Sequence, residues 1–179
     1  MRVLSGKYKG RSLKYDHKLI RPTSSKLKES ICSILYDEIQ NALVLDLCCG
    51  SGAVTIELIS RGAKEAYGID KNLKIALHNK KQLGLDNFYL LRSDAKKAIE
   101  NFAKKEKKFD IIYVDPPYLD SIQEDLLLKI SKFDILHKKG TLLLENDSKQ
   151  PLSDQIGQLY LQKKYQYGQT SLRLYRYCD

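Results

Sequence analysis

Long apolar runs are missing from this sequence of 179 residues. A membrane-spanning helix needs about 20 consecutive apolar residues, and no stretch reaches that length. The first residues also lack the pattern of a secretory signal. We therefore expect a cytoplasmic protein that does not act at a membrane. Internal repeats and low-complexity linkers are absent as well, and the length is typical of a single α/β unit, which we expect to be a monomer.

Cysteine and histidine are sparse and poorly placed for a metal site. The four cysteines form no Cys-x-x-Cys pair, and none is spaced with one of the three histidines as metal ligands would be. Adjacent Cys48 and Cys49 make poor joint ligands. We predict that the protein holds no metal and that its cysteines are small buried thiols in a reducing cytosol.

The glycine pattern that binds a dinucleotide is incomplete. A short apolar strand that begins at Val44 runs into Gly50-Ser51-Gly52, and a helical stretch over 53–61 follows. The two glycines allow a tight turn and a close approach of the backbone to a cofactor. Thr55 stands where the third glycine or alanine belongs, which disfavours NAD. Asp46, four residues before Gly50, is instead typical of enzymes that use S-adenosylmethionine (SAM), where such an acid approaches the methionine part.

Acidic residues end the next strands at regular intervals. Asp70 follows Asp46 by 24 residues, Asp94 follows Asp70 by 24, and Asp115 follows Asp94 by 21. Any one of them could cap a helix instead. Together, at the spacing of βα units, they predict a SAM site with Asp70 at the ribose hydroxyls and Asp94 at the adenine amine. We assign to this site Asp46, Gly50, Ser51, Gly52, Asp70, Lys71, Asp94 and Ala95.

The fold predicted from this pattern is α/β: a Rossmann-like, class I SAM-dependent methyltransferase fold. A helix over about 121–137 precedes a fifth buried strand over 140–145, and two tyrosine-rich segments over 158–165 and 170–177 form a closing antiparallel pair. We expect a mostly parallel seven-stranded sheet whose last strand is antiparallel.

A proline-rich turn follows the strand over 109–114. Asp115-Pro116-Pro117-Tyr118 cannot continue the sheet, because its prolines lack amide hydrogens. Such a turn suits methyl transfer to an exocyclic amine, whose lone pair is delocalised into the base. The carboxylate and the carbonyl of Pro116 would accept the two amine hydrogens, and the tyrosine ring would stack on the base. Asp-Pro also begins ordinary turns. The position of this turn in the larger pattern favours a catalytic role over an ordinary turn.

Positive charge gathers at the N-terminus. Nine Lys and Arg residues stand against two acids in the first 30 residues, so this segment carries +7 of the net charge of +9. Such segments bind phosphate backbones, although a basic run can also be a solvated surface. We predict that residues 1–20 form a basic β-hairpin extension and that residues 21–179 form the methyltransferase domain. A helix from about Pro22 should bury an apolar stripe and leave Lys26 and Lys28 outward.

These motifs resemble those of the bacterial 16S rRNA guanine-N2 methyltransferases of the RsmD type over nearly the whole chain. The resemblance rests on Gly6–Arg11, on Arg21-Pro22-Thr23 with Glu29, on 45–53, on Asp115–Tyr118 and on Gly168 with Leu174-Tyr175. The N-terminal motifs are the specific ones, because many amino-methylating enzymes share Asp-Pro-Pro-Tyr. Cys48 and Cys49 depart from the usual Phe-Ala, and Asp70 replaces a frequent Glu.

The resemblance implies SAM as methyl donor and guanine 966 of 16S rRNA as target, in an assembled or assembling 30S subunit. The predicted RNA contacts are Lys7, Lys9, Arg11, Arg21 and Thr23. Two alternatives stay open. An adenine-N6 DNA methyltransferase would share the catalytic turn, although such an enzyme usually carries a target-recognition domain. A catalytically inactive RNA-binding assembly factor would not need the acidic and glycine positions that are present here.

Overall fold

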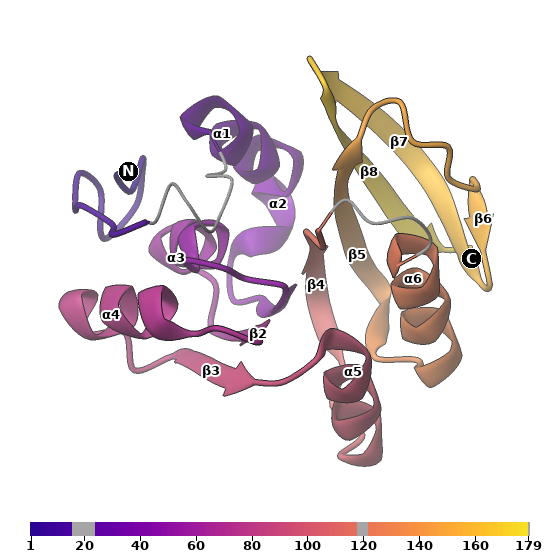
Figure 1. Cartoon of the computed structure of the whole chain (residues 1–179), viewed down its shortest axis with the longest axis horizontal. Coiled ribbons are helices and arrows are strands. Elements are labelled where there is room, and N and C mark those ends of the chain that lie inside the picture. Colours follow the sequence, from indigo (N-terminus) through magenta and orange to yellow (C-terminus); the bar gives the residue numbers. More distant parts are fainter. Residues whose placement is uncertain (16–23, 118–121, 179) are drawn as a thin grey trace.

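One eight-stranded sheet organises the protein. A computed structural model describes residues 1–15, 24–117 and 122–178 (Figure 1). The strands lie in the order β3-β2-β1-β4-β5-β8-β7-β6. Their bounds are β1 Leu43–Leu47, β2 Glu65–Asp70, β3 Phe88–Arg92, β4 Phe109–Val114, β5 Leu136–Asp147, β6 Gln155–Ile156, β7 Leu159–Tyr167 and β8 Thr170–Tyr177.

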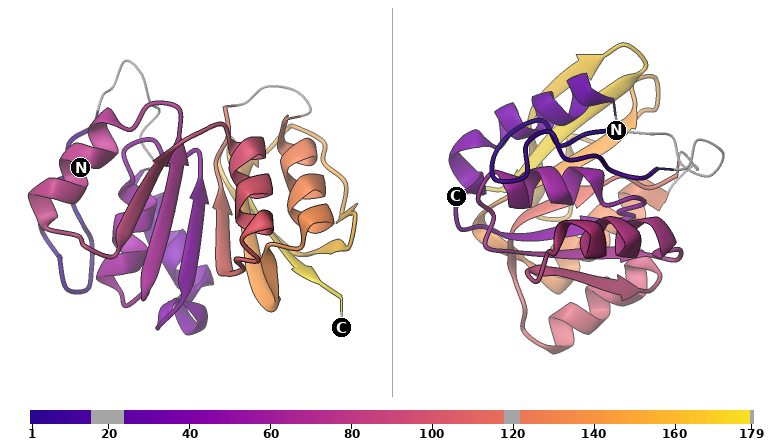
Figure 2. Two further views of the ribbon diagram at one scale, coloured as in Figure 1. Left: turned by 90° about the horizontal axis from the view of Figure 1, so that it is seen from below. Right: turned by 90° about the vertical axis from the view of Figure 1, so that its left-hand side faces the viewer.

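Helices cover both faces of the sheet (Figure 2). The helices are α1 Ser25–Ile34, α2 Tyr36–Ile39, α3 Ala53–Ser60, α4 Lys74–Leu83, α5 Ala95–Lys104 and α6 Ile122–Phe133. Buried side chains of α1 and α3 share one apolar core, and those of α5 and α6 share the core on the opposite face. No helix in the described part of the chain is both long and apolar enough to cross a membrane.

The predicted fold class is confirmed. Strands β1 to β5 are parallel, with β1 between β2 and β4, and β8 pairs antiparallel with β5. The predicted closing pair is β7 and β8. A two-residue strand, β6, adds an eighth member at the edge. Strand β5 begins earlier than predicted, because α6 ends at Phe133 and Asp134 adopts a positive φ of 50° that breaks the helix.

The N-terminal hairpin is predicted over residues 1–20, of which the structure describes residues 1–15. Residues 1–15 reverse direction, but a single antiparallel bridge joins Arg2 to Ser12. Three backbone amides, those of Val3, Gly10 and Leu13, donate across the reversal, and other amides of the segment donate to α3. The amides of Leu4 and Ser5 donate to the carboxylate of Glu57. Two further amides, at positions 7 and 8, donate to Ser60. The segment therefore packs beside α3 (Figure 1).

The prediction that Lys28 points outward is wrong. Ser24 caps α1 by accepting from the amide of Leu27, and Lys28 on the next position is fully buried. Its ammonium group donates to the carbonyl of Arg2 at 2.7 Å and lies 3.5 Å from Glu57 Oε2. Burial lowers the pKa of Lys28, and the charge of Glu57 opposes that shift. Lys28 thus joins the N-terminal segment to α1 and α3, while Lys26 is exposed as predicted.

Candidate active site

The carboxyl ends of the central parallel strands meet at one edge of the sheet. Leu47, the last residue of β1, pairs with Ile69 on β2 and with Val114 on β4. The chain continues this pairing for one more residue on each side. The amide of Asp115 donates to the carbonyl of Leu47 at 3.2 Å, and the amide of Cys49 donates to the carbonyl of Ile69 at 3.0 Å. The glycine turn, Asp70 and Asp115 therefore lie at neighbouring strand ends.

The turn after β1 depends on its glycines. Gly50 and Gly52 have φ values of 54° and 75°, which glycine adopts without the strain that a side chain would add. A Cβ on Gly52 would also lie 3.0 Å from the ring of Phe88. Asp70 holds the turn in place, since its Oδ2 accepts from the amide of Gly50 at 2.9 Å. The carbonyl of Ser51 accepts from the buried amide of Asn79 at 3.0 Å.

Asp46 lies on β1, and one of its oxygens is bonded within the described residues. Its side chain is buried, and Oδ2 accepts from the hydroxyl of Thr55 on α3. Within the described residues, no donor reaches Oδ1. Burial raises the pKa of Asp46 to about 7, the Thr55 hydrogen bond opposes the shift, and the charges of Asp70 and Glu145 add to it. A buried acceptor of this kind fits a ligand that carries an ammonium group, as the methionine part of SAM does.

Asp94 is placed as a helix cap. It precedes Ala95, the first residue of α5, and its Oδ1 accepts from the amide of Lys96 at 2.9 Å. Lys71, which follows β2, lies 3.5 Å from Asp94 Oδ2. Burial acts to raise the pKa of Asp94, but the amides of Lys96 and Lys97 and the charge of Lys71 outweigh it and lower the pKa. Asp94 is exposed, so the carboxylate remains accessible to a ligand at this edge.

The proline turn follows β4 at the same edge of the sheet as the glycine turn. Asp115 is half-buried, Pro116 is buried and Pro117 is exposed. Tyr118 lies outside the described residues. Beneath the turn, the phenol of Tyr113 donates to Glu145 Oε2 at 2.5 Å. Burial, together with the negative charges of Asp115 and Glu145, raises the pKa of Tyr113 well above its usual value.

Sequence reasoning missed three residues of this site: Thr55, Tyr113 and Glu145. Thr55 had been considered only as a departure from the dinucleotide pattern, yet its hydroxyl is the partner of Asp46. Glu145 carried a usable signal, because it is an acid near the end of a parallel strand, like Asp70. Tyr113 stands two residues before Asp115, on the same face of β4, and the alternation of a strand could have identified it.

Comparison with known proteins establishes the family. The family described as Conserved hypothetical protein 95 matches residues 1–176. The chain belongs to this family. "Putative rRNA methyltransferase YlbH" of Bacillus subtilis (strain 168) is 35% identical over 181 residues, covering 98% of both chains. "Ribosomal RNA small subunit methyltransferase D" of Escherichia coli (strain K12) is 26% identical over 180 residues, covering 98% of this chain and 89% of the relative.

A solved structure agrees with these relatives. The structure described as "Putative methyltransferase yhhF from Escherichia coli" superposes with a TM-score of 0.87 at 26% identity, and covers 99% of this chain and 97% of its own. The fold is thus the Rossmann-like fold of SAM-dependent methyltransferases, and the resemblance to the RsmD-type family is confirmed.

Three of the RNA contacts predicted for this RsmD-type chain lie on the N-terminal loop. Lys7, Lys9 and Arg11 are exposed, and the ammonium group of Lys7 lies 5.4 Å from the centre of the Tyr8 ring. Arg21 and Thr23 lie outside the described residues. The loop presents these three cations, together with those of Arg2 and Lys14, on a backbone that hydrogen-bonds to α3.

Cys48 and Cys49 directly precede the glycine turn. Cys48 has a φ of 68°, which is uncommon for a residue with a side chain. Burial and the nearby carboxylates of Asp70 and Asp46 raise the pKa of Cys48 to about 12, and burial also raises the pKa of Cys49. Both side chains therefore remain protonated thiols that fill space behind the glycine turn.

Proposed function

We propose that this protein is an rRNA methyltransferase that transfers a methyl group from SAM to the exocyclic N2 of a guanine in 16S rRNA, at position 966. The names of the relatives support small-subunit rRNA as the class of substrate. The observation that carries the chemistry is the Asp115-Pro116-Pro117 turn at the end of β4, beside the glycine turn of β1. That neighbourhood supports the role of Asp115 as an amine acceptor beside the cofactor.

The chain's own residues account for binding the cofactor. Asp46 offers its unbonded oxygen to the ammonium group of SAM, and the backbone of Gly50 to Gly52 allows close approach. Asp70 uses one lone pair of each oxygen on the amides of Gly50 and Asn72, so its remaining lone pairs can accept from the ribose hydroxyls. The adenine end of the cofactor contacts Asp94, Lys71 and Ala95. When bound, SAM supplies an electrophilic methyl group on a sulfonium.

The proline turn would hold and activate the amine. Asp115 accepts one hydrogen of the guanine amine and the carbonyl of Pro116 accepts the other, which directs the nitrogen lone pair out of the ring plane. Tyr118 stacks on the base after it leaves its helix. The negative field of Asp115, Glu145 and Asp46 stabilises positive charge as it moves from sulfur to nitrogen. Positioning and this field provide the catalysis.

The basic N-terminal extension, residues 1–20, would bind the RNA backbone next to the methyltransferase domain, residues 21–179. Lys7, Lys9 and Arg11 neutralise phosphates. Arg21 and Thr23 contact the RNA closer to the target base. The substrate is the assembled or assembling 30S subunit, on which the protein acts as a monomer in the cytoplasm.

The test is transfer of labelled methyl groups from SAM to 30S subunits, naked 16S rRNA and duplex DNA. We expect transfer to 30S subunits, with the label at N2 of guanine 966. Asp115→Ala should lower the single-turnover rate by roughly 10²–10⁴-fold, the range for a positioned proton acceptor, and Asp115→Asn, which keeps one acceptor oxygen, by less. SAM affinity, measured by calorimetry, should change little in both variants.

Three results would contradict the proposal in different ways. Preferred labelling of duplex DNA would indicate an adenine-N6 DNA methyltransferase. Binding of 30S subunits without any transfer would indicate an assembly factor. Normal single-turnover rates in Asp115→Ala would remove this carboxylate from the chemistry.

A further inference from the structure

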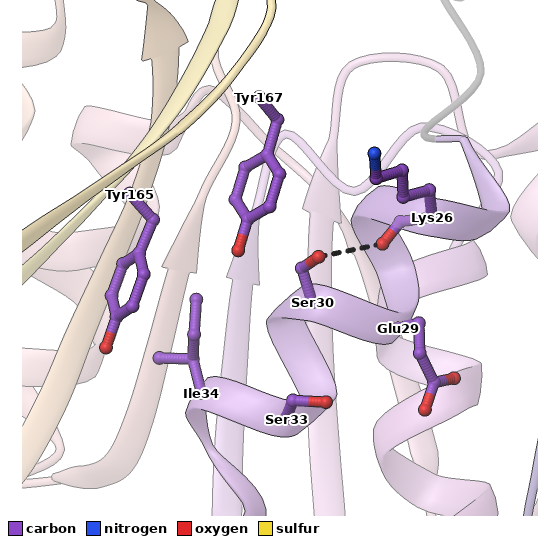
Figure 3. Close-up of a pocket in the computed structure, with 7 residues that line it drawn as sticks. All are labelled: Lys26, Glu29, Ser30, Ser33, Ile34, Tyr165 and Tyr167. Atoms are coloured by element: carbon purple, nitrogen blue, oxygen red, sulfur yellow. Dashed lines mark hydrogen bonds between the residues drawn. The ribbon is translucent and has the colours of Figure 1, made fainter.

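A groove of about 470 Å³ lies between α1 and β7, away from the predicted SAM contacts. Figure 3 shows the rings of Tyr165 and Tyr167 projecting from β7 toward Ser30 and Ile34 on α1. Both rings are half-buried, and one side of each packs on the core that α1 and α3 share. Lys26, Glu29, Ser30, Ser33, Ile34, Tyr165 and Tyr167 line the groove.

The sheet register places this groove level with the proline turn. On β5, Glu145 pairs with Leu172, and Leu172 pairs with Tyr165. The residue before Glu145 pairs with the last residue of β4, which directly precedes Asp115. Asp115, Glu145, Leu172 and Tyr165 therefore form one row across the sheet, on the face that α1 covers. Three strand spacings separate the two ends of the row, or about 14 Å, a distance that a few nucleotides span.

The charge around the groove favours an anionic occupant. Lys26 is exposed at its rim and forms no ion pair within the described residues. Lys163 is exposed on β7, with its ammonium group 4.9 Å from the centre of the Tyr165 ring. The carboxylate of Glu29, the acid in the lining, is neutralised by Arg61 at 2.7 Å. Neighbouring aromatic rings flanked by cations are the combination that binds single-stranded nucleic acid.

We propose that this groove binds unpaired rRNA nucleotides that flank the methylated base. Tyr165 and Tyr167 stack on the bases, and Lys26 and Lys163 contact the phosphates. The inference rests on the proposed function for the identity of the RNA, and it adds a second contact surface, separate from the N-terminal loop. With this surface, RNA is held on two sides of the reacting amine, which restricts the orientation of the target nucleotide.

The test compares stacking variants in binding and in turnover. A labelled single-stranded RNA of ten nucleotides is titrated with wild type, Tyr165→Ala, Tyr167→Ala, and the matched Tyr165→Phe and Tyr167→Phe. Loss of one stacked base should raise the dissociation constant about 5- to 150-fold, whereas the Phe variants, which keep the ring, should bind as wild type does. Tyr36→Ala removes an exposed tyrosine outside the groove and serves as control. SAM affinity should be unchanged throughout.

A second pair of variants keeps the test independent of folding. Lys26→Gln and Lys163→Gln change exposed side chains, and each should reduce the salt slope of RNA binding by about 0.7. Wild-type RNA affinity in both Ala variants would overturn the proposal. So would a KM that rises for 30S subunits but not for naked 16S rRNA, because a ribosomal protein would then occupy the groove. If wild type fails to methylate 30S subunits while the tyrosines still govern RNA binding, the proposed function fails and the groove assignment holds.

Discussion

Gly6 and Gly10 provide a matched test of how the N-terminal loop is attached. Their φ values are 79° and 80°, so an alanine at either position incurs the same backbone strain, about 1–2 kcal/mol. Their surroundings differ. A Cβ on Gly6 would lie 1.8 Å from the carbonyl oxygen of Ser60, whereas a Cβ on Gly10 would meet no atom within 4 Å. The contact is with backbone at the end of α3, which cannot rotate away.

Gly6→Ala must therefore lift the loop from α3. That movement would break the hydrogen bonds from the Lys7 amide to the Ser60 carbonyl, at 2.7 Å, and from the Tyr8 amide to Ser60 Oγ, at 2.9 Å. With about 1 kcal/mol net for each bond and some lost packing, we expect Gly6→Ala to be less stable than Gly10→Ala by about 2–4 kcal/mol. Urea denaturation of both variants at equal m-values measures this difference.

The same pair tests the function of the loop. In Gly6→Ala the cations of Lys7, Lys9 and Arg11 lose their fixed position, so RNA binding should weaken and its salt slope should flatten by about two units if all three contact phosphates. Gly10→Ala should bind RNA much as wild type does, and both variants should keep SAM affinity. Equal stability of the two variants, within about 0.5 kcal/mol, would refute the docking of the loop on α3.

Two further predictions concern the SAM site. Burial raises the pKa of Asp46 from 3.8 to about 7. Between these two pH values the folded protein keeps a proton on Asp46 that the unfolded chain has released. The stability of the protein therefore falls as the pH rises through this window. Asp46→Asn should therefore gain stability relative to wild type between about pH 4 and pH 7, by a total of about 4 kcal/mol in urea denaturation, while binding SAM more weakly. A constant difference in stability across this range would contradict the burial argument. Asp70→Ala should raise the SAM dissociation constant roughly tenfold or more, since a charged hydrogen-bond acceptor contributes about 1.5–3 kcal/mol; unchanged calorimetric affinity would mean that Asp70 only holds the Gly50 turn.

The parallel sheet was predictable because its central strands, β1 and β4, are buried on both faces. Such strands are nearly continuous apolar runs, as in Phe109–Val114, and their carboxyl ends share an edge, so the acids that follow them converge. The position of Asp70 beside the glycine turn followed from this rule alone. The contacts that Asp70 makes did not follow, because they depend on which backbone amides the turn directs toward it.

The environment of Lys28 could not be predicted, because it depends on residues distant in sequence. Helical periodicity allows position 28 to face inward beside Leu27 and Ile31, and only the charge argued against it. The charge is tolerated because Glu57, on another helix, and the carbonyl of Arg2 meet it inside the protein. The same carboxylate accepts hydrogen bonds from the amides of Leu4 and Ser5 in the N-terminal loop. A single buried acid thus accounts both for the burial of Lys28 and for the attachment of the N-terminal loop to α3.

Two acids with similar burial show how structural and ligand-binding roles differ here. Glu57 is buried and its oxygens accept from the amides of Leu4 and Ser5, from Lys28 and from Arg61. Asp46 is equally buried, yet Oδ1 has no donor within the described residues. An unsatisfied buried carboxylate oxygen lowers stability, so a fold gains nothing from it unless a ligand completes the bonding. The acid that binds α3 to the N-terminal loop therefore has its hydrogen bonds in the free protein, whereas under the proposed function the ammonium group of SAM would complete those of the acid under the glycine turn.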